Sequence, residues 1–224
     1  MTTAIITGAS VGIGLETAKG LARKGFDLIL VSRNIEKLKL IKSNLENNFN
    51  ISCNVHSYDL SLIKSNIEFY NQIIKSHQNI DVLINNVGAI FMNRTVTSEG
   101  IEKTFALNHM SYFTLSKLFS ESFSKLRIIN VSSEAHRAIK LKINDFQNSH
   151  MYYGWHAYKR SKLANIYLTY ELAKKYEDKD ITVNCLHPGL VNSDFANNNS
   201  LRYKIMSSLI TVSYTHLTLP TTFG

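Results

Sequence analysis

The sequence predicts one α/β domain with a doubly wound parallel sheet. Short β-rich runs alternate along the chain with longer stretches in which apolar residues recur about every 3.6 positions. Strand-like runs such as 81–85 are almost continuously apolar, as strands buried on both faces are. A glycine-rich loop follows the first of these runs directly. Together these features imply a parallel sheet that helices cover on both sides.

The expected elements follow one another in a regular order. Six strands are predicted, at 3–7, 27–32, 51–58, 81–85, 127–132 and 181–186. Helical periodicity is found between them, for example at 35–46 and 61–76. Asn34 is a good N-cap for the first of these helices, which repeats apolar residues at Ile35, Leu38 and Ile41. No internal repeat and no domain boundary is visible.

Composition sets limits on the class of protein. A chain of 224 residues with 44% hydrophobic residues suits one compact domain. Lys and Arg outnumber Asp and Glu by 25 to 17, which could favour nucleic acid or a phosphorylated cofactor. The basic residues are scattered, with short clusters at 37–42 and 137–142, so solvated faces are favoured over a nucleic-acid surface. Cys53 and Cys185 lack partners at metal-ligand spacing and are predicted to be free core thiols.

The two ends of the chain carry further expectations. Met1 leads into "AIITGAS" without the charged and apolar regions of a signal peptide, and no apolar run approaches the ~20 residues of a membrane span. A soluble, cytoplasmic protein is therefore expected. Residues 212–221, "VSYTHLTLPT", match one translated reading frame of a transposase-type sequencing adapter. The sequence thus predicts a domain at 1–211, incomplete in its C-terminal substrate region, and a non-native tail at 212–224.

The glycine-rich loop "TGASVGIG" (7–14) has the context of a phosphate-binding loop. Gly8, Gly12 and Gly14 lie between the first strand and the first helix. Glycine allows a tight turn and a close approach of the backbone to a ligand. The free N–H groups and positive dipole end of the helix suit a pyrophosphate, so the loop predicts dinucleotide binding.

Four motifs in the right order resemble the short-chain dehydrogenase/reductase family. They are the glycine loop, "NNVG" (85–88), the Tyr-x-x-x-Lys of "AYKRSK" (157–162) and "HPG" (187–189). The resemblance runs from about residue 2 to 195 and implies a Rossmann fold. "NVSSEAH" (130–136) and "SKLAN" (161–165) are most similar to the retinol dehydrogenase and WW-domain oxidoreductase branch. Val87 departs from the family's usual alanine, and the segment between Ser133 and Tyr158 is longer than in most members, although that branch shares the insertion.

The resemblance implies a catalytic set of Asn108, Ser133, Tyr158 and Lys162. Tyr158 would be the acid–base group, and Lys162, one helical turn later on the same face, would lower the pKa of Tyr158 from about 10 and hold the nicotinamide ribose. Ser133 would orient the substrate oxygen, and Asn108 would support a water that links Lys162 to solvent.

The Tyr158–Lys162 pair and Ser133 have competitors in the sequence, and Asn108 could be an ordinary polar helix residue. A second Tyr-x-x-x-Lys, Tyr170 and Lys174, lies about 120° further round the helix and should face elsewhere. Ser132 competes with Ser133, but alternation in the preceding strand aims the two oppositely. Surface or cleft positions are expected for His109, His136 and His156, because no carboxylate-supported pair stands at ligand spacing. No metal site is predicted.

The end of the second strand indicates which nicotinamide cofactor is used. NAD-selective chains carry an acid there, whereas this chain has Ser32 and Arg33, and Arg can pair with a 2′-phosphate. NADP(H) is therefore expected rather than NAD(H), although Arg33 could also be an ordinary loop residue. Cofactor contacts are expected from Gly8, Ser10, Gly12, Ile13, Gly14, Ser32, Arg33, Asp59, Leu60, Asn86, Gly88, Tyr158, Lys162, Pro188, Gly189 and Val191.

The sequence thus predicts an NADP(H)-dependent interconversion of a small carbonyl and an alcohol. A non-catalytic module that senses NADP(H) with the same fold is the main alternative. The intact set Asn108, Ser133, Tyr158 and Lys162 argues against it, because a sensor needs no proton relay. The substrate cannot be read from the sequence, and a homo-oligomer remains open.

Overall fold

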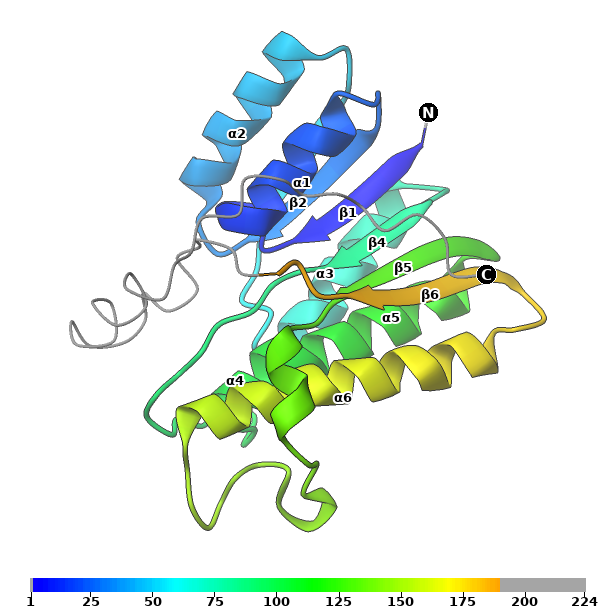
Figure 1. Ribbon diagram of the computed structural model, residues 1–224. Coiled ribbons are helices and arrows are strands. Elements are labelled where there is room, and N and C mark those ends of the chain that lie inside the picture. The colour runs from blue at the N-terminus through cyan, green and yellow to red at the C-terminus, as the bar shows by residue number, and fades with distance from the viewer. Residues whose placement is uncertain (1, 190–224) are drawn as a thin grey trace.

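The computed structural model describes residues 2–189 and contains a six-stranded sheet in the order β3-β2-β1-β4-β5-β6 (Figure 1). All neighbouring strands are parallel. The strands are β1 (Thr3–Thr7), β2 (Asp27–Ser32), β3 (Cys53–Ser57), β4 (Val82–Asn85), β5 (Lys125–Val131) and β6 (Asp180–Leu186). The main helices are α1 (Gly12–Ala22), α2 (Ile35–Asn48), α3 (Ile63–Ser76), α4 (Lys103–Phe105), α5 (Ser111–Ser122) and α6 (Gly154–Lys175). Short turns are η1 (Ala106–Met110), η2 (Glu134–Ala138) and η3 (Ile143–Asp145).

All six predicted strands are present, and β1 and β2 have the predicted bounds. The differences elsewhere follow from strand pairing. β5 begins two residues earlier than predicted because Lys125 pairs with Asp180 of β6, a polar pair that a search for apolar runs does not find. The predicted cap of α2 is confirmed, since the Asn34 side chain accepts a hydrogen bond of 2.9 Å from the Lys37 amide.

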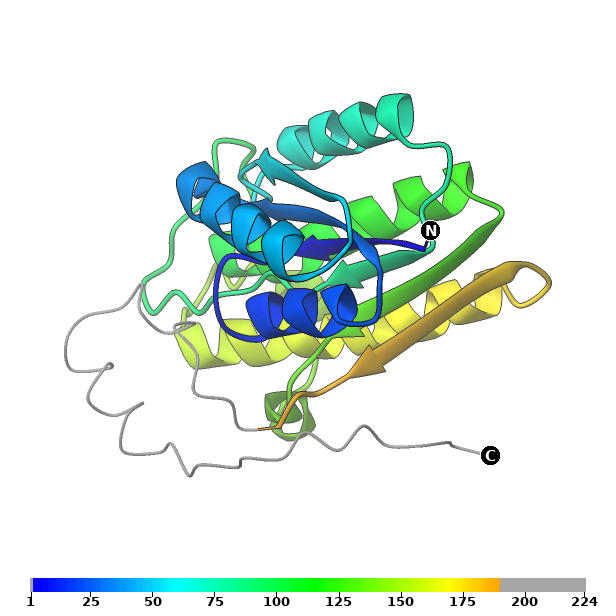
Figure 2. The same ribbon diagram turned by 90° about the horizontal axis from the view of Figure 1, so that it is seen from above.

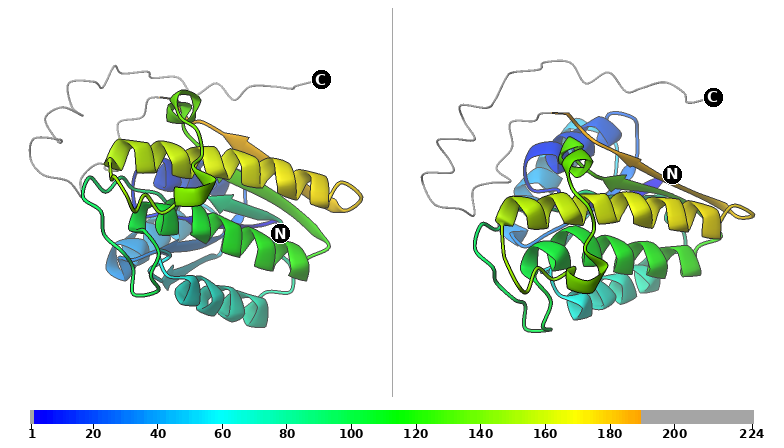
Figure 3. Two further views of the ribbon diagram at one scale, coloured as in Figure 1. Left: turned by 90° about the horizontal axis from the view of Figure 1, so that it is seen from below. Right: turned by 60° about the horizontal axis from the view of Figure 1, so that its bottom comes forward.

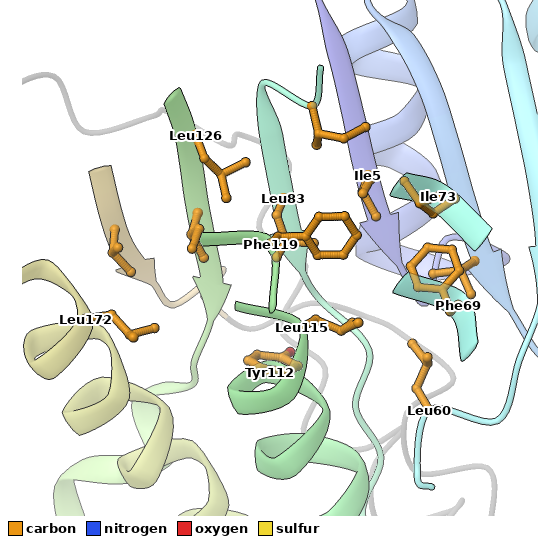
Figure 4. Close-up of a cluster of buried hydrophobic side chains, with 14 of the residues drawn as sticks. Ile5, Leu60, Phe69, Ile73, Leu83, Tyr112, Leu115, Phe119, Leu126 and Leu172 are labelled. Atoms are coloured by element: carbon orange, nitrogen blue, oxygen red, sulfur yellow. The ribbon is translucent and has the colours of Figure 1, made fainter. Parts of the chain in front are cut away.

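Helices cover the two faces of the sheet unequally. α1 and α2 lie on one face, and α3, α5 and α6 lie on the other (Figures 1, 2 and 3). Alternation along each strand divides the core accordingly. Ile5 packs with Phe69 of α3 and Phe119 of α5, whereas Ile6 packs with Leu38 of α2 (Figure 4). The sequence therefore folds into the predicted doubly wound sheet.

Coverage on both faces is confirmed for the inner strands and differs at the β5–β6 edge. There, within residues 2–189, Arg127, Thr182 and Asn184 point to the side of α1 and are exposed. Cys185 on the same strand is also exposed, so the prediction that it is a core thiol is wrong, while Cys53 is buried as predicted. Within the described residues, the outward face of β6 carries the polar residues Thr182 and Asn184 together with Leu186, which is 41% exposed.

The strand order reverses between β1 and β4, and this places a crevice at their carboxyl ends. β1 lies between β2 and β4, so the chain leaves β1 toward one side and β4 toward the other. Such a switch point is where doubly wound sheets bind ligands. Within residues 2–189, no helix has the length and apolar character needed to cross a bilayer. The predicted division of the chain at residue 211 and the predicted contact of Val191 lie outside the described residues.

Candidate active site

The glycine loop forms one wall of the crevice. Gly8 has φ 69°, and its amide donates to the Val31 carbonyl at 2.9 Å, which bends the chain over the end of β2. A Cβ atom on Gly8 would lie 2.9 Å from the Cα of Val87. Gly12, with φ 55°, begins α1. Only glycine fits the turn and the close approach to Val87, and the free amides of the α1 N-terminus face the crevice mouth.

The loop after β4 forms the opposite wall and is tied to the first. The Thr7 hydroxyl donates to the Ile84 carbonyl at 3.3 Å and accepts from the amides of Asn86 and Val87 at 2.9 and 3.0 Å. The Asn86 side chain donates back to the Thr7 carbonyl at 2.8 Å. These bonds hold the two walls in one fixed arrangement.

Most of the predicted cofactor contacts gather in one pocket between these walls. Its lining includes Gly8, Ser10, Gly12, Ile13, Ser32, Arg33, Asp59, Leu60, Asn86 and Gly88. Gly14 lies behind the lining, packed on Gly8, while Pro188 and Gly189 follow β6. Six further lining residues were not predicted from the sequence: Val11, Asn34, Tyr58, Val87, Ala89 and Leu107. Each of them is adjacent in sequence to a predicted site residue. That adjacency could have identified them as lining residues.

The residues of this pocket fit a phosphorylated dinucleotide. The Ser32 hydroxyl is buried at the end of β2 and has no hydrogen-bond partner among the described residues, although it belongs to a pocket-lining residue. A buried hydroxyl without a partner is costly unless a ligand satisfies it. Arg33 beside it is exposed and can supply a planar cation to a phosphate. On the other flank, one Asp59 carboxylate oxygen is taken by the Ser61 amide and hydroxyl at 3.0 and 2.8 Å.

Tyr158 and Ser133 meet at the carboxyl end of β5. Ser133 follows the strand and caps η2, with its hydroxyl accepting from the Ala135 amide at 3.3 Å. Tyr158 lies in the second turn of α6 and shares a hydrogen bond with the Ser133 side chain. The predicted pair is thus brought together by a strand end and a helix start that are 25 positions apart.

The start of α6 is fixed by close packing on the loop after β4. A Cβ atom on Gly154 would lie 2.7 Å from the Cα of Met92, so the helix backbone touches that loop directly. The Tyr152 hydroxyl donates to the Phe91 carbonyl at 2.7 Å and also bonds the buried Glu102. The longer segment between Ser133 and Tyr158 therefore ends in residues that pack against the loop after β4. This packing fixes the position of Tyr158 at the start of α6.

Lys162 lies one turn below Tyr158 and is almost completely buried. Its Nζ donates to the Val131 carbonyl at 2.8 Å and stands 5.9 Å from the Tyr158 ring centroid. A Cβ atom on Gly88 would approach this Nζ to 3.4 Å and the Asn108 Oδ1 to 3.3 Å. Gly88 thus keeps the pocket open toward the lysine. Burial lowers the pKa of Lys162 to about 7.

The expected lowering of the Tyr158 pKa by Lys162 is not what the structure shows. Burial raises the pKa of Tyr158, and the hydrogen bond with Ser133 lowers it in part. The lysine Nζ stands 5.9 Å from the centroid of the Tyr158 ring and donates its hydrogen bond to the Val131 carbonyl. Tyr158 is accordingly protonated at neutral pH, which suits a proton donor.

Asn108 lies in the π-helical turn η1, where the helix bulges between α4 and α5. Its side chain makes two hydrogen bonds of 2.9 Å with the main chain of Ala89. It accepts one from the Ala89 amide and donates the other to the Ala89 carbonyl. Its main-chain carbonyl accepts from Asn165 at 2.8 Å. π-turns often mark functional sites, and this one delivers Asn108 next to Gly88 and Lys162. The water link from Asn108 to solvent stays a prediction.

The competing residues lie in other environments. Ser132 donates to the main-chain carbonyl of Lys162 at 2.9 Å, so it ties β5 to α6. The second pair fails because Tyr170 is 69% exposed on the far side of α6. His109 is half-buried, bonding Asn165 through Nδ1 at 2.9 Å, and burial lowers its pKa. In the described part of the chain, no group of His, Cys, Asp and Glu could hold a metal ion.

Comparison with known proteins agrees with this geometry. The family model for short chain dehydrogenase matches residues 2–204. Human retinol dehydrogenase 13 is 35% identical over 211 residues, covering 92% of this chain and 64% of that protein. The WW domain-containing oxidoreductase of Drosophila melanogaster is 36% identical over 88% of this chain and 51% of its own length. Thus the chain spans less than two thirds of these relatives.

A solved structure supports the same assignment. A short-chain dehydrogenase from Sphingobium yanoikuyae, in complex with NADPH, aligns with a TM-score of 0.73 and 25% identity, covering 87% of this chain and 73% of that one. The parallel sheet with its switch-point crevice is a Rossmann fold. The chain therefore belongs to the short-chain dehydrogenase family, and its curated relatives place it in the retinol dehydrogenase-like branch of that family.

Proposed function

We propose that the protein is an oxidoreductase that interconverts a small carbonyl compound and an alcohol with NADP(H). One observation carries the proposal: a protonated, partly buried phenol, Tyr158, is hydrogen-bonded to Ser133 beside the buried amine of Lys162. These groups lie at the same sheet edge as a pocket that fits a phosphorylated dinucleotide. The family and its named dehydrogenase relatives support an oxidoreductase.

In the reducing direction the residues divide the work as follows. The Tyr158 hydroxyl donates its proton to the carbonyl oxygen, while the Ser133 hydroxyl hydrogen-bonds the same oxygen and keeps it in line. The resulting phenolate is stabilised by the nearby Lys162 in its ammonium form. Asn108 fixes the Ala89 backbone above the pocket and so holds the wall next to Gly88. The cofactor, held by the glycine loop and by Ser32 and Arg33, would supply the hydride.

NADP(H) is proposed over NAD(H) on the strength of Ser32 and Arg33 in the pocket lining. The Sphingobium yanoikuyae enzyme, to which the chain is similar, is named as a complex with NADPH. No carboxylate occupies the Ser32 or Arg33 position at the end of β2, where an acid would repel the phosphate.

Arg33→Ala should weaken NADPH binding roughly tenfold to a hundredfold and NADH binding much less. A charge-assisted hydrogen bond contributes about 1.5–3 kcal/mol, and only NADPH carries the phosphate. Fluorescence titration with both cofactors measures the effect. The matched control is Arg23→Ala, which removes the same charge from an exposed position at the end of α1. Equal losses for the two cofactors would show that Arg33 only supports the loop.

The alternative, a non-catalytic NADP(H) sensor, does not explain why acid–base groups are placed beside the buried Lys162. Lys162 is 3% exposed, and its pKa of about 7 means that burial strongly disfavours its charged form. Cofactor binding alone could use the Lys162 amine, but it gives no reason for a phenol that is hydrogen-bonded to Ser133 beside that amine. The alternative predicts cofactor binding without turnover, so a carbonyl panel separates the two.

Four further expectations from the sequence remain proposals. A cytoplasmic location and a small-molecule substrate rest on the sequence and the family, and self-association stays open. The idea that 212–224 is an adapter-derived tail rests on the sequence match alone.

A further inference from the structure

Tyr112 is a second tyrosine beside the proposed catalytic lysine, and no sequence motif marks it. It projects from α5 into the core beneath the sheet and is fully buried (Figure 4). Its hydroxyl donates to the Val131 carbonyl at 3.4 Å, the same oxygen that accepts from Lys162 at 2.8 Å. The Lys162 Nζ stands 5.2 Å from the Tyr112 ring centroid. Tyr112 therefore contacts the lysine environment both through its ring and through a shared acceptor.

We propose that Tyr112 is a positioning residue for Lys162, whose ammonium form it stabilises with the face of its ring beside the Val131 carbonyl. The inference rests on the proposed role of Lys162 and names the group that makes that role possible inside the core. An aromatic face within about 6 Å attracts a cation, most strongly where water is excluded. The geometry here meets both conditions.

The surroundings of Lys162 leave few other ways to hold a positive charge. Burial lowers its pKa to about 7, and no carboxylate among residues 2–189 offsets that effect. Nζ stands 5.2 Å from the Tyr112 ring centroid and 5.9 Å from the Tyr158 ring centroid. It donates to the Val131 carbonyl and lies, like the amide oxygen of Asn108, beside Gly88. Of these only the two tyrosines can titrate. A neutral π-face and a carbonyl dipole are thus the main stabilisers of the cation.

Tyr112 acts without exchanging a proton. Burial raises its pKa well above 10, and the neighbouring Tyr158 raises it further, because two phenolates cannot lie close together. Its hydroxyl also points at Val131 and away from the pocket lining. Tyr112 is therefore distinct from the proposed proton donor.

The test compares Tyr112→Leu with Tyr112→Phe. Leucine removes the ring, so the Lys162 pKa should fall by about one unit, whereas phenylalanine keeps the ring and should leave it near the wild-type value. The Lys162 titration is followed by NMR on protein labelled with ¹³Cε-lysine, with Lys162→Met to assign the signal. In turnover assays with aldehydes and ketones, the high-pH limb of kcat/KM should move down by the same amount, because the ammonium form is lost as pH rises through this pKa.

A matched control separates positioning from packing. Phe119→Leu removes an equally buried ring from the same helix and the same core cluster, seven positions beyond Tyr112 (Figure 4). It should lower the melting temperature much as Tyr112→Leu does and leave the Lys162 titration unchanged. Should Tyr112→Leu fail to fold, Tyr112→Met fills more of the space and also lacks the ring.

A Lys162 titration that is the same in wild-type, Tyr112→Leu and Tyr112→Met protein would overturn the inference. So would an equal shift in Phe119→Leu, because the effect would then come from loosened packing. The NMR titration needs neither substrate nor turnover. A failure of the proposed activity would therefore leave this result standing, and the two can be told apart.

Discussion

Tyr158→Phe is expected to lower turnover by ~10²–10⁴ while NADPH binding stays near the wild-type level. The variant keeps the ring that packs against Trp155 and Lys162, so the fold of this region is preserved. It removes only the hydroxyl that bonds Ser133 and that is proposed to donate the proton. Steady-state assays with NADPH and a panel of aldehydes and ketones measure the loss, and fluorescence titration measures cofactor binding.

Tyr170→Phe is the matched control on the same helix. Tyr170 belongs to the second Tyr-x-x-x-Lys pair, and its side chain is largely in solvent, so loss of its hydroxyl should change turnover less than twofold. Near-normal turnover of Tyr158→Phe would show that another group supplies the proton.

Gly14→Ala should destabilise the protein by roughly 1–3 kcal/mol or more and should also weaken cofactor binding. The added methyl would lie 2.6 Å from the Asn86 amide nitrogen and would press into the Gly8 carbonyl. Neither can retreat easily, because Asn86 is bonded to the Thr7 carbonyl and Gly8 to Val31. The glycine loop and the β4 loop would be forced apart. Urea denaturation and NADPH titration measure the two consequences.

Gly20→Ala, in the same helix, is expected to have the opposite effect on stability. A Cβ atom at Gly20 meets nothing within 4 Å. Alanine there should raise stability by about 0.5–1 kcal/mol, because it restricts the unfolded chain and favours the helix. If both variants lost stability equally, steric contact between the loops would not be the reason that Gly14 is required.

Local patterns were sufficient to predict the fold where the chain carries its own signals. β1 and β2 are apolar runs that end at turn or capping residues, Gly8 and Asn34, and their bounds were predicted correctly. The start of β5 was missed because tertiary pairing with β6 decides it. The π-turn at Asn108 was missed as well, since no local pattern distinguishes it from an ordinary helix.

In the candidate site, too, local motifs predicted some residues, whereas others depend on the tertiary structure. Ser133, Tyr158 and Lys162 stand out by motif, and the structure brings all three together. Tyr112 could not be predicted, because its importance comes from lying beside Lys162, 50 positions away, and its sequence surroundings are those of a core aromatic residue. The predicted lowering of the Tyr158 pKa by Lys162 does not appear, because burial raises this pKa and the hydrogen bond that lowers it in part comes from Ser133. Burial is a property of the folded molecule and cannot be read from the motif.

Hydride transfer itself gives the most direct test of the proposed function. The purified protein is incubated with NADPH that carries deuterium at both C4 positions and with each carbonyl compound of the panel, and the alcohol is examined by mass spectrometry. We expect wild-type protein to form an alcohol with one deuterium on the carbon that bore the carbonyl oxygen, and Tyr158→Phe to form it at least a hundredfold more slowly. An alcohol without deuterium, or equal rates of labelled product from the two proteins, would contradict hydride transfer with Tyr158 as the proton donor.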